Sequence, residues 1–163
     1  MSAGYHERAL MCVNGHVVTM ILSLASELGS PFCSDCGAKT ISTCPDCQAP
    51  IRGEYMVPGV VSFADEEEAP AFCHACGKPY PWTRDRLAAA QEMARELESL
   101  DPEERELLAS SLADIMVDGP RTQLAASRTK RLLAKAGTPG KALYQFVMDF
   151  GAKVAAEIIL SQT

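Results

Sequence analysis

The spacing of apolar residues divides this chain into two halves that predict different secondary structure. In residues 1–82 the apolar runs are short and rich in β-branched side chains, as expected for strands. These runs lie at residues 17–21, 39–41, 51–57 and 60–63. From residue 83 onward, apolar residues recur every three or four positions, which is the spacing of one helix face. The pattern predicts an α+β protein with one domain at residues 1–82 and a helical domain at residues 83–163.

Start and stop signals in the second half predict a bundle of about four helices. The first of these helices spans residues 84–100. Asp101-Pro102-Glu103-Glu104 supplies a cap, a proline at the first helical position and a carboxylate that reaches back, so a second helix begins there. A third helix follows Asp118-Gly119-Pro120 and ends at Gly137.

The fourth predicted helix, at residues 139–160, has the widest apolar face of the four. The simpler interpretation places it at the centre of the bundle. The alternative is a homodimer interface through residues 139–160, since the face is wider than three short neighbouring helices need.

The first half contains all seven cysteines and few large apolar side chains, so a hydrophobic core alone is not expected to hold it. Seven cysteines and one histidine form four closely spaced pairs that suit a tetrahedral metal. The pairs are Cys12/His16, Cys33/Cys36, Cys44/Cys47 and Cys73/Cys76. Eight N/S ligands fill two Zn²⁺ sites with none left over, which predicts two tandem zinc ribbons.

Sequential use of the four pairs is the simplest arrangement of ligands. The first site then takes the pairs at residues 12/16 and 33/36, and the second takes those at 44/47 and 73/76. An interleaved arrangement, first pair with third, is the alternative. Four protein ligands leave no open coordination position, so both ions are expected to be structural. Each would supply about 10–16 kcal/mol of folding free energy at neutral pH.

Two other histidines stand outside this ligand set. His74 lies inside the Cys73–Cys76 turn and is interpreted as an exposed residue, although it could replace a cysteine. His6 is interpreted as a surface residue. Neither a signal peptide nor an apolar run of about 20 residues is present in the sequence, which predicts a cytoplasmic protein without a membrane partner.

The third predicted helix carries a stripe of basic residues. At 100° per residue, four cations fall within an arc of about 80°. They are Arg121, Arg128, Arg131 and Lys135. One interpretation pairs them with acids of the first two helices, such as Glu92, Glu96 or Glu106. The other makes the stripe a partner-binding surface for an acidic helix or a phosphate backbone.

Several motifs resemble a bacterial family known as domain-of-unknown-function family 2321. The resemblance rests on the sequence stretches at residues 12–16, 32–41, 44–53, 58–61 and 73–83. It continues through residues 118–122 and the closing helix, so it covers nearly the whole chain. The resemblance implies a bacterial cytosolic protein with two zinc ribbons and a helical tail, and it implies no particular activity.

Three classes of function can be weighed from the sequence: an enzyme, a nucleic-acid-binding protein and a protein-interaction module. No Ser/His/Asp set, Gly-rich phosphate loop or open metal site is present in the sequence, so no catalytic residues are assigned and no enzyme is expected. The net charge of −6 lies mostly in the first half and disfavours phosphate-backbone binding by the ribbons. We therefore expect a non-catalytic protein-interaction or adaptor module. The alternative is a nucleic-acid-binding protein that uses the basic stripe together with the ribbons.

Overall fold

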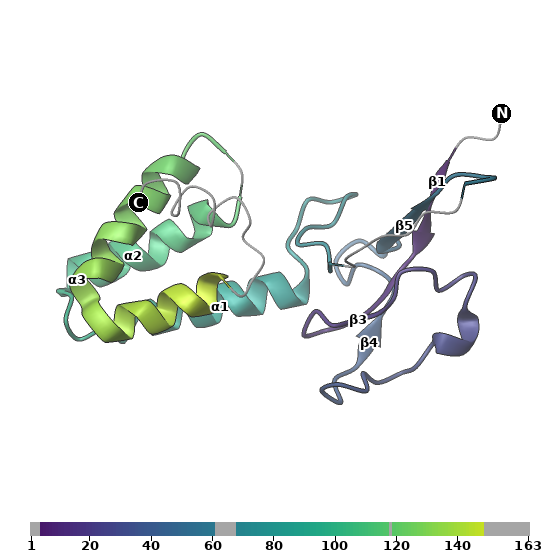
Figure 1. Cartoon of the computed structure of the whole chain (residues 1–163), viewed down its shortest axis with the longest axis horizontal. Coiled ribbons are helices and arrows are strands. Elements are labelled where there is room, and N and C mark those ends of the chain that lie inside the picture. Colours follow the sequence, from purple (N-terminus) through teal and green to yellow (C-terminus); the bar gives the residue numbers. More distant parts are fainter. Residues whose placement is uncertain (1–3, 61–67, 118, 149–163) are drawn as a thin grey trace. The chain divides into compact units, whose positions relative to one another are not determined.

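The computed structural model describes residues 4–60, 68–117 and 119–148 (Figure 1). The chain forms two compact units, Met1–Arg84 and Asp85–Thr163. The five strands found in the described residues all lie in the first unit, and the described elements of the second unit are helices. The α+β class expected from the apolar pattern is confirmed. Within the described residues, none of the helices combines the length and apolar character that a bilayer span requires.

Two small antiparallel sheets build the first unit. One pairs β1 (Tyr5–Arg8) with β5 (Arg52–Met56). The other has the order β3-β2-β4, and a short 3₁₀ helix, η1, lies between β3 and β4 in the sequence. The bounds of its elements are Leu10–Cys12 for β2, Val17–Thr19 for β3, Ser26–Leu28 for η1 and Thr40–Ile41 for β4. Three of the expected strands are thus present, each slightly shorter than its apolar run.

Two strands, β1 and β2, were not expected from the apolar pattern. Tyr5–Arg8 is mostly polar, and it becomes a strand because it pairs with β5, far away in the sequence. Leu10–Cys12 lies between β3 and β4, with Met11 opposite Ile41. Of the strand expected at residues 60–63, Val60 is not in a strand, and residues 61–63 lie outside the described residues.

The core of the first unit is small and contains two cysteines of the predicted ligand set. Ala9, Met11 and Ile51 are fully buried, and they pack with two aromatic side chains and two cysteines. The aromatic residues are Tyr80 and Trp82, and the cysteines are Cys44 and Cys73. Few large aliphatic side chains contribute, so this unit depends on another source of stability.

Three helices occur in the described residues: α1 (Pro81–Arg95), α2 (Pro102–Ile115) and α3 (Thr122–Met148). The expectation of about four helices is therefore wrong. Gly137, with φ 67° and ψ −134°, breaks the helical path, but no loop follows it, so the third and fourth predicted helices form one kinked element. Residues 149–160 of the predicted fourth helix lie outside the described residues.

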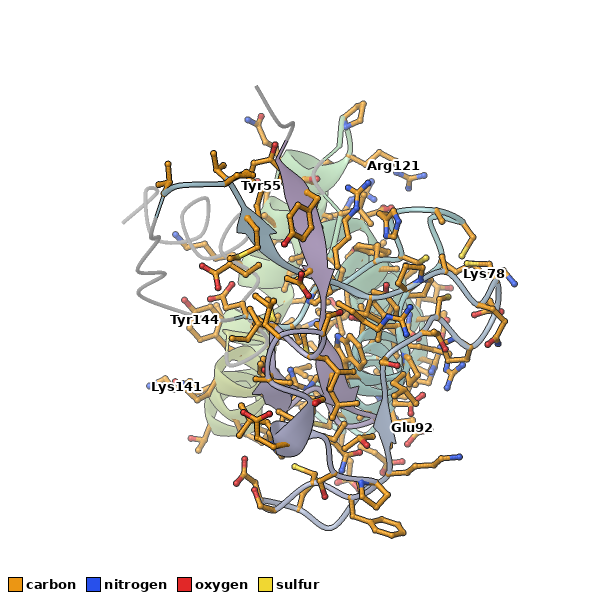
Figure 2. All side chains as sticks on the ribbon, turned by 90° about the vertical axis from the view of Figure 1, so that its right-hand side faces the viewer. Tyr55, Lys78, Glu92, Arg121, Lys141 and Tyr144 are labelled. Atoms are coloured by element: carbon orange, nitrogen blue, oxygen red, sulfur yellow. The ribbon has the colours of Figure 1, made fainter. Side chains whose placement is uncertain are left out.

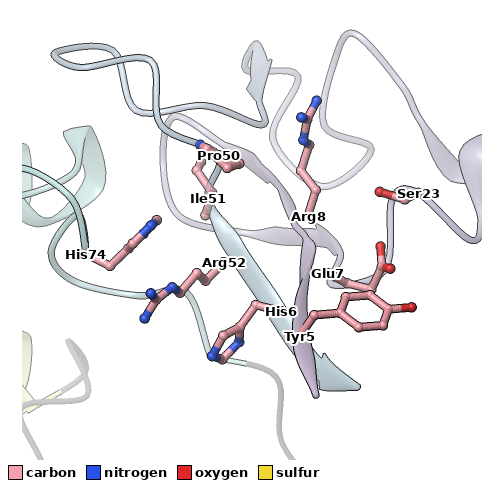
Figure 3. Close-up of a pocket in the computed structure, with 9 residues that line it drawn as sticks. All are labelled: Tyr5, His6, Glu7, Arg8, Ser23, Pro50, Ile51, Arg52 and His74. Carbon is pink, nitrogen blue, oxygen red and sulfur yellow. The ribbon is translucent and has the colours of Figure 1, made fainter. Parts of the chain in front are cut away.

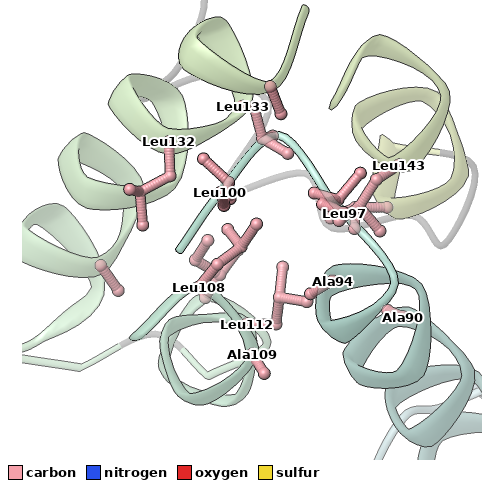
Figure 4. Close-up of a cluster of buried hydrophobic side chains, with 14 of the residues drawn as sticks. Ala90, Ala94, Leu97, Leu100, Leu108, Ala109, Leu112, Leu132, Leu133 and Leu143 are labelled. Atoms are coloured by element: carbon pink, nitrogen blue, oxygen red, sulfur yellow. The ribbon is translucent and has the colours of Figure 1, made fainter. Parts of the chain in front are cut away.

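The helical unit packs around one cluster of buried Ala, Leu and Ile side chains (Figure 4). α2 contributes Leu108, Leu112 and Ile115, and α3 contributes Leu132 and Leu143 among others. The segment after α1 also packs into the cluster. Leu97 and Leu100 are buried there, although the helix ends earlier than the apolar spacing predicts.

The start of α2 is the capping box that the sequence predicts. The Glu104 main-chain N–H donates to the Asp101 carboxylate at 2.9 Å, and the Asp101 N–H donates to the Glu104 carboxylate at 3.2 Å. The first of these bonds is the main reason why the pKa of Asp101 lies below its usual value. Lys135, which pairs with Glu104, adds to this effect.

This cap makes the stability of the helical unit sensitive to acid. The pKa of Asp101 is lower in the folded chain, so the unfolded chain binds more protons as the pH falls, and the stabilisation is lost through the folded pKa. We expect the thermal midpoint of helical circular dichroism to fall below about pH 4. The Asp101→Asn variant, which keeps the acceptor oxygen, should show a weaker acid dependence. Identical pH profiles for both proteins would contradict this role of the carboxylate.

Candidate metal centres

Three Cys-x₂-Cys segments fold into the same tight turn. In each, the N–H of the first cysteine donates to a carbonyl five residues later, at 2.8–2.9 Å. In a second hydrogen bond, the N–H of the residue four positions after the first cysteine donates to the carbonyl of that cysteine. This geometry places both sulfur atoms on one side of the turn. The first cysteine is buried and the second is exposed in all three turns.

Each turn needs a positive φ at the residue after its second cysteine. Gly37 has φ 69° and Gly77 has φ 71° at this position. In the third turn it is Gln48 that has φ 61°, the one non-glycine residue with positive φ in the described part of the chain. Glycine adopts this conformation without steric cost, whereas a residue with a side chain does so at about 1–2 kcal/mol.

A Gly77→Ala substitution is expected to destabilise the metal-loaded first unit by about 1–2 kcal/mol. The cause is backbone strain alone, because no atom lies within 4 Å of the position a Cβ would take. Chemical unfolding monitored by Trp82 fluorescence measures the effect. Gln48→Gly, at the equivalent position, is the matched control and should not destabilise by a similar amount. A Gly77→Ala protein as stable as the original would rule out strain at this turn.

The first group of ligand atoms comes from the β2–β3 hairpin and one tight turn. Cys12 ends β2, and His16 lies four residues further on. The Cys12 Sγ lies 3.5 Å from the His16 Nδ1 and 3.8 Å from the Cys36 Sγ. The Cys33 Sγ lies 3.6 Å from the same imidazole nitrogen. All four ligand atoms lie within 4.8 Å of one another.

The second group of ligand atoms comes from two tight turns that face each other. The Cys44 Sγ lies 3.9 Å from the Cys76 Sγ, and the Cys47 Sγ lies 3.6 Å from the Cys73 Sγ. These four sulfur atoms also lie within 4.8 Å of one another. An exposed ion pair joins the two turns, with the Lys78 Nζ 2.7 Å from an Asp46 carboxylate oxygen. The structure thus brings the eight predicted ligands together in the sequential order, not the interleaved one.

The spacing within both groups fits a tetrahedral metal site. A Zn–S bond of about 2.3 Å places two sulfur ligands of a tetrahedron about 3.8 Å apart, and a sulfur and an imidazole nitrogen about 3.6 Å apart. Three S–S distances of 3.6–3.9 Å and two S–N distances of 3.5 and 3.6 Å are close to these values, and the other ligand atoms of each group lie within 4.8 Å of one another. The two groups can therefore hold a metal ion each, with thiolate and imidazole ligands.

Main-chain N–H groups prepare two of the thiols to bind a cation. The N–H of Ala38 is the main reason why the pKa of Cys36 falls to about 6. The N–H groups of Cys76 and Ala75 similarly lower the pKa of Cys73 to about 6. Both effects favour the thiolate, which is the form that binds metal.

The histidines outside the predicted ligand set are not part of either group. His74 is exposed in the turn between Cys73 and Cys76, as expected, and does not replace a cysteine. The His6 ring is also exposed, and its Nδ1 lies 3.2 Å from the carbonyl oxygen of Gly53. Both interpretations made from the sequence agree with these positions.

An aromatic pair connects the two ligand groups. The rings of Tyr80 and Trp82 stack, with centroids 4.7 Å apart and an interplanar angle of 18°. Burial raises the pKa of the Tyr80 hydroxyl, and its hydrogen bond with Cys73 acts in the same direction. Trp82 packs at Gly15, within the turn of the first group, where a Cβ would lie only 2.9 Å from the Trp82 Cβ. The sequence alone did not predict that these two aromatic rings stack between the ligand groups. The only indication in the sequence was that both aromatic residues lie close to the last cysteine.

The basic stripe, which begins at Arg121 directly before α3 and continues along this helix, is partly neutralised by acids of α2. Arg121 lies 3.1 Å from Asp114, and Lys135 lies 2.5 Å from Glu104. Neither acid is among those expected to pair with the stripe, and Glu106 pairs with Arg95 instead. Figure 2 shows Arg121 at the surface, and its side chain is 71% exposed. Within the described ranges, no ion pair is recorded for the remaining two cations, Arg128 and Arg131.

A family model described as "Uncharacterized protein conserved in bacteria (DUF2321)" matches residues 5–159. The match spans both ligand groups and all three helices. No curated protein and no solved structure matches the chain.

Proposed function

We propose that this chain, which belongs to that bacterial family, is a non-catalytic adaptor whose first unit is held by two structural Zn²⁺ ions. The observation that supports this proposal best is the pair of four-ligand groups with tetrahedral spacing. Zn²⁺ is the metal that Cys₃His and Cys₄ sets bind most often in structural sites. The cytoplasm is the matching compartment, since thiols stay reduced there and remain available to a metal.

A structural role for the ions follows from their coordination. Four protein ligands complete a tetrahedral shell, so no position remains for a water or a substrate that the metal could activate. The thiolates are committed as ligands and are poor nucleophiles in that state. The proposed contribution of the metal is therefore to fix loops that the small core of the first unit cannot hold by itself.

The proposed partner is a protein, because the segment before the Cys33 turn exposes large apolar side chains. Leu24, Leu28 and Phe32 are 58%, 51% and 61% exposed, within nine residues of one another. Exposed apolar residues gathered on one segment are typical of protein-binding surfaces. Phe32 directly precedes Cys33, so the first metal group would fix the position of this segment.

Capture experiments in a bacterial lysate test this proposal. A metal-loaded chain is the bait, and the Leu28→Ser/Phe32→Ser double variant is the matched control. Elemental analysis of both baits should return two zinc ions per chain. We expect at least one protein to be captured by the original chain and lost with the double variant. A zinc content of one ion or none per chain would contradict the proposal. Capture of the same proteins by both baits would also contradict it.

Nucleic-acid binding through α3 is the second candidate, favoured only by Arg128 and Arg131. Two of the four stripe cations already pair with acids, which lowers the local positive charge. We therefore expect no salt-dependent binding of duplex DNA or single-stranded RNA at low ionic strength in a fluorescence anisotropy titration. Binding that weakens steeply with salt and is lost in Arg128→Glu would instead establish this second function.

A further inference from the structure

A groove of about 670 Å³ lies in the helical unit. One wall comes from α1 and the residues directly after it, and the other comes from the last part of α3. The apolar side chains of its lining are Ala89, Met93, Leu97, Pro139, Ala142 and Leu143. On both walls they recur every three or four residues, so each wall presents one apolar row. At about 30 Å³ per water molecule, the groove has room for about 22 waters, enough for several side chains of a third helix.

The floor of this groove is buried, whereas parts of its walls are open. Leu97 and Leu143 are 5% and 0% exposed and belong to the buried cluster (Figure 4). Pro139 and Ala142 are exposed, and Met93 is half-buried. A seam between two apolar helix faces is the usual seat of a third helix, whose side chains insert between the two rows. In the described part of the chain, only the two walls line the groove, so its occupant is to be sought outside these residues.

The last residues of the chain have the apolar face that this groove needs. Residues 149–163 follow α3 directly and lie outside the described residues. Within them, Val154, Ala155, Ile158 and Ile159 recur at the spacing of one helix face. At 100° per residue, their side chains fall within an arc of about 140°. A helix with this sequence is amphipathic, and its apolar face is stable only when it is buried against another surface.

The position of the groove and the length of this segment agree. The groove lies beside residues 139–143 and α3 ends at Met148, so the segment reaches the groove only if the chain reverses its direction. Gly151 is placed for such a reversal, because a glycine at the end of a helix readily adopts the left-handed conformation that terminates it. A helix over residues 152–160 is about 14 Å long, which matches the length of about 15 Å for the last part of α3.

We propose that residues 152–160 form a helix that packs back into this groove of the same chain, with Val154, Ile158 and Ile159 against the two apolar rows. The short connection through residues 149–151 holds the helix at an effective concentration in the millimolar range. A second copy at micromolar protein concentration competes poorly with a segment held in this way. The docked helix is independent of the proposed adaptor function, because it uses none of the metal ligands and none of the exposed apolar segment.

Methyl NMR of the metal-loaded full chain tests the proposal. With ¹³C-labelled Ile and Met methyl groups in one chain, we expect nuclear Overhauser effects between the methyl groups of Ile158 or Ile159 and that of Met93. A mixture of chains labelled only on Ile with chains labelled only on Met should show none of them, because the contact lies within one chain.

Ile158→Ser is the decisive variant, because it places a hydroxyl in the apolar face of the helix. It should abolish the contact between Ile159 and Met93 and speed amide hydrogen exchange in residues 152–160 by about tenfold or more. Leu160→Ser is the matched control, since residue 160 lies on the opposite side of this helix and the same substitution there should leave both signals unchanged. The metal content of both variants should equal that of the original chain.

Three results would overturn the proposal. Absence of the Ile–Met contact in the full chain would mean that the groove is not filled by this segment, as when α3 continues straight to residue 160 or a partner protein uses the groove. The same contact in the mixed sample would mean that a second copy fills the groove. Equal effects of Ile158→Ser and Leu160→Ser would mean that no particular face of the segment is docked.

Discussion

Removal of metal by a strong chelator is expected to unfold the first unit while most of the helical circular dichroism remains. The first unit has a small core that includes cysteines of the second ligand group. Two structural zinc sites would contribute about 10–16 kcal/mol each, which exceeds what so small a core supplies. The helical unit has its own cluster of buried Ala, Leu and Ile side chains and contains no predicted ligand.

Trp82 gives this experiment a specific readout, because it is the only tryptophan in the chain. Its side chain is 3% exposed, and its Nε1 donates to the Pro70 carbonyl at 2.9 Å. Loss of the metal should expose the indole and shift its emission to longer wavelength, and added zinc should reverse the shift. Unchanged emission after complete metal removal would contradict the structural role of the ions. Loss of helical signal in parallel with the emission shift would show that the two units unfold together.

A Cys73→Ser substitution is expected to remove one metal ion of two and to disorder the second ligand group. Cys73 is buried, its sulfur lies 3.6 Å from the Cys47 sulfur, and the Tyr80 hydroxyl hydrogen-bonds with it. A serine hydroxyl is a poor ligand for a thiolate-bound metal, because it is not ionised at neutral pH. The first ligand group shares no residue with the second, so its own ion should remain.

His74→Ala is the matched control for this variant, since the residue lies in the same turn but outside the ligand group. Elemental analysis should give one zinc ion per chain for Cys73→Ser and two for His74→Ala. Trp82 emission should shift in the first variant only, because the cysteines of the second ligand group pack in one cluster with Tyr80 and Trp82 and lose their metal ion. Loss of metal from His74→Ala, or two ions retained by Cys73→Ser, would mean that the ligands are assigned wrongly.

The features that the sequence predicted well depend on residues close together in the chain. A Cys-x₂-Cys turn is complete within a few residues, so its ligands and its need for a positive φ at Gly37 and Gly77 can be read from spacing alone. The capping box at Asp101 is equally local. The predicted number of helices was too high because of Gly137. The backbone does leave the helical conformation at this residue, as predicted, but no loop separates the two helical parts.

Contacts between residues that are far apart in the sequence were determined only by the tertiary structure. The polar residues Tyr5–Arg8 become a strand because β5 supplies their hydrogen bonds, and no local pattern reports such a partner. The same pairing places Arg8 opposite Arg52, two residues that lie far apart in the sequence (Figure 3). The acids that neutralise Arg121 and Lys135 are also set by how α2 packs on α3. Spacing in the sequence determines local geometry and ligand chemistry, whereas burial and long-range pairing depend on the whole fold.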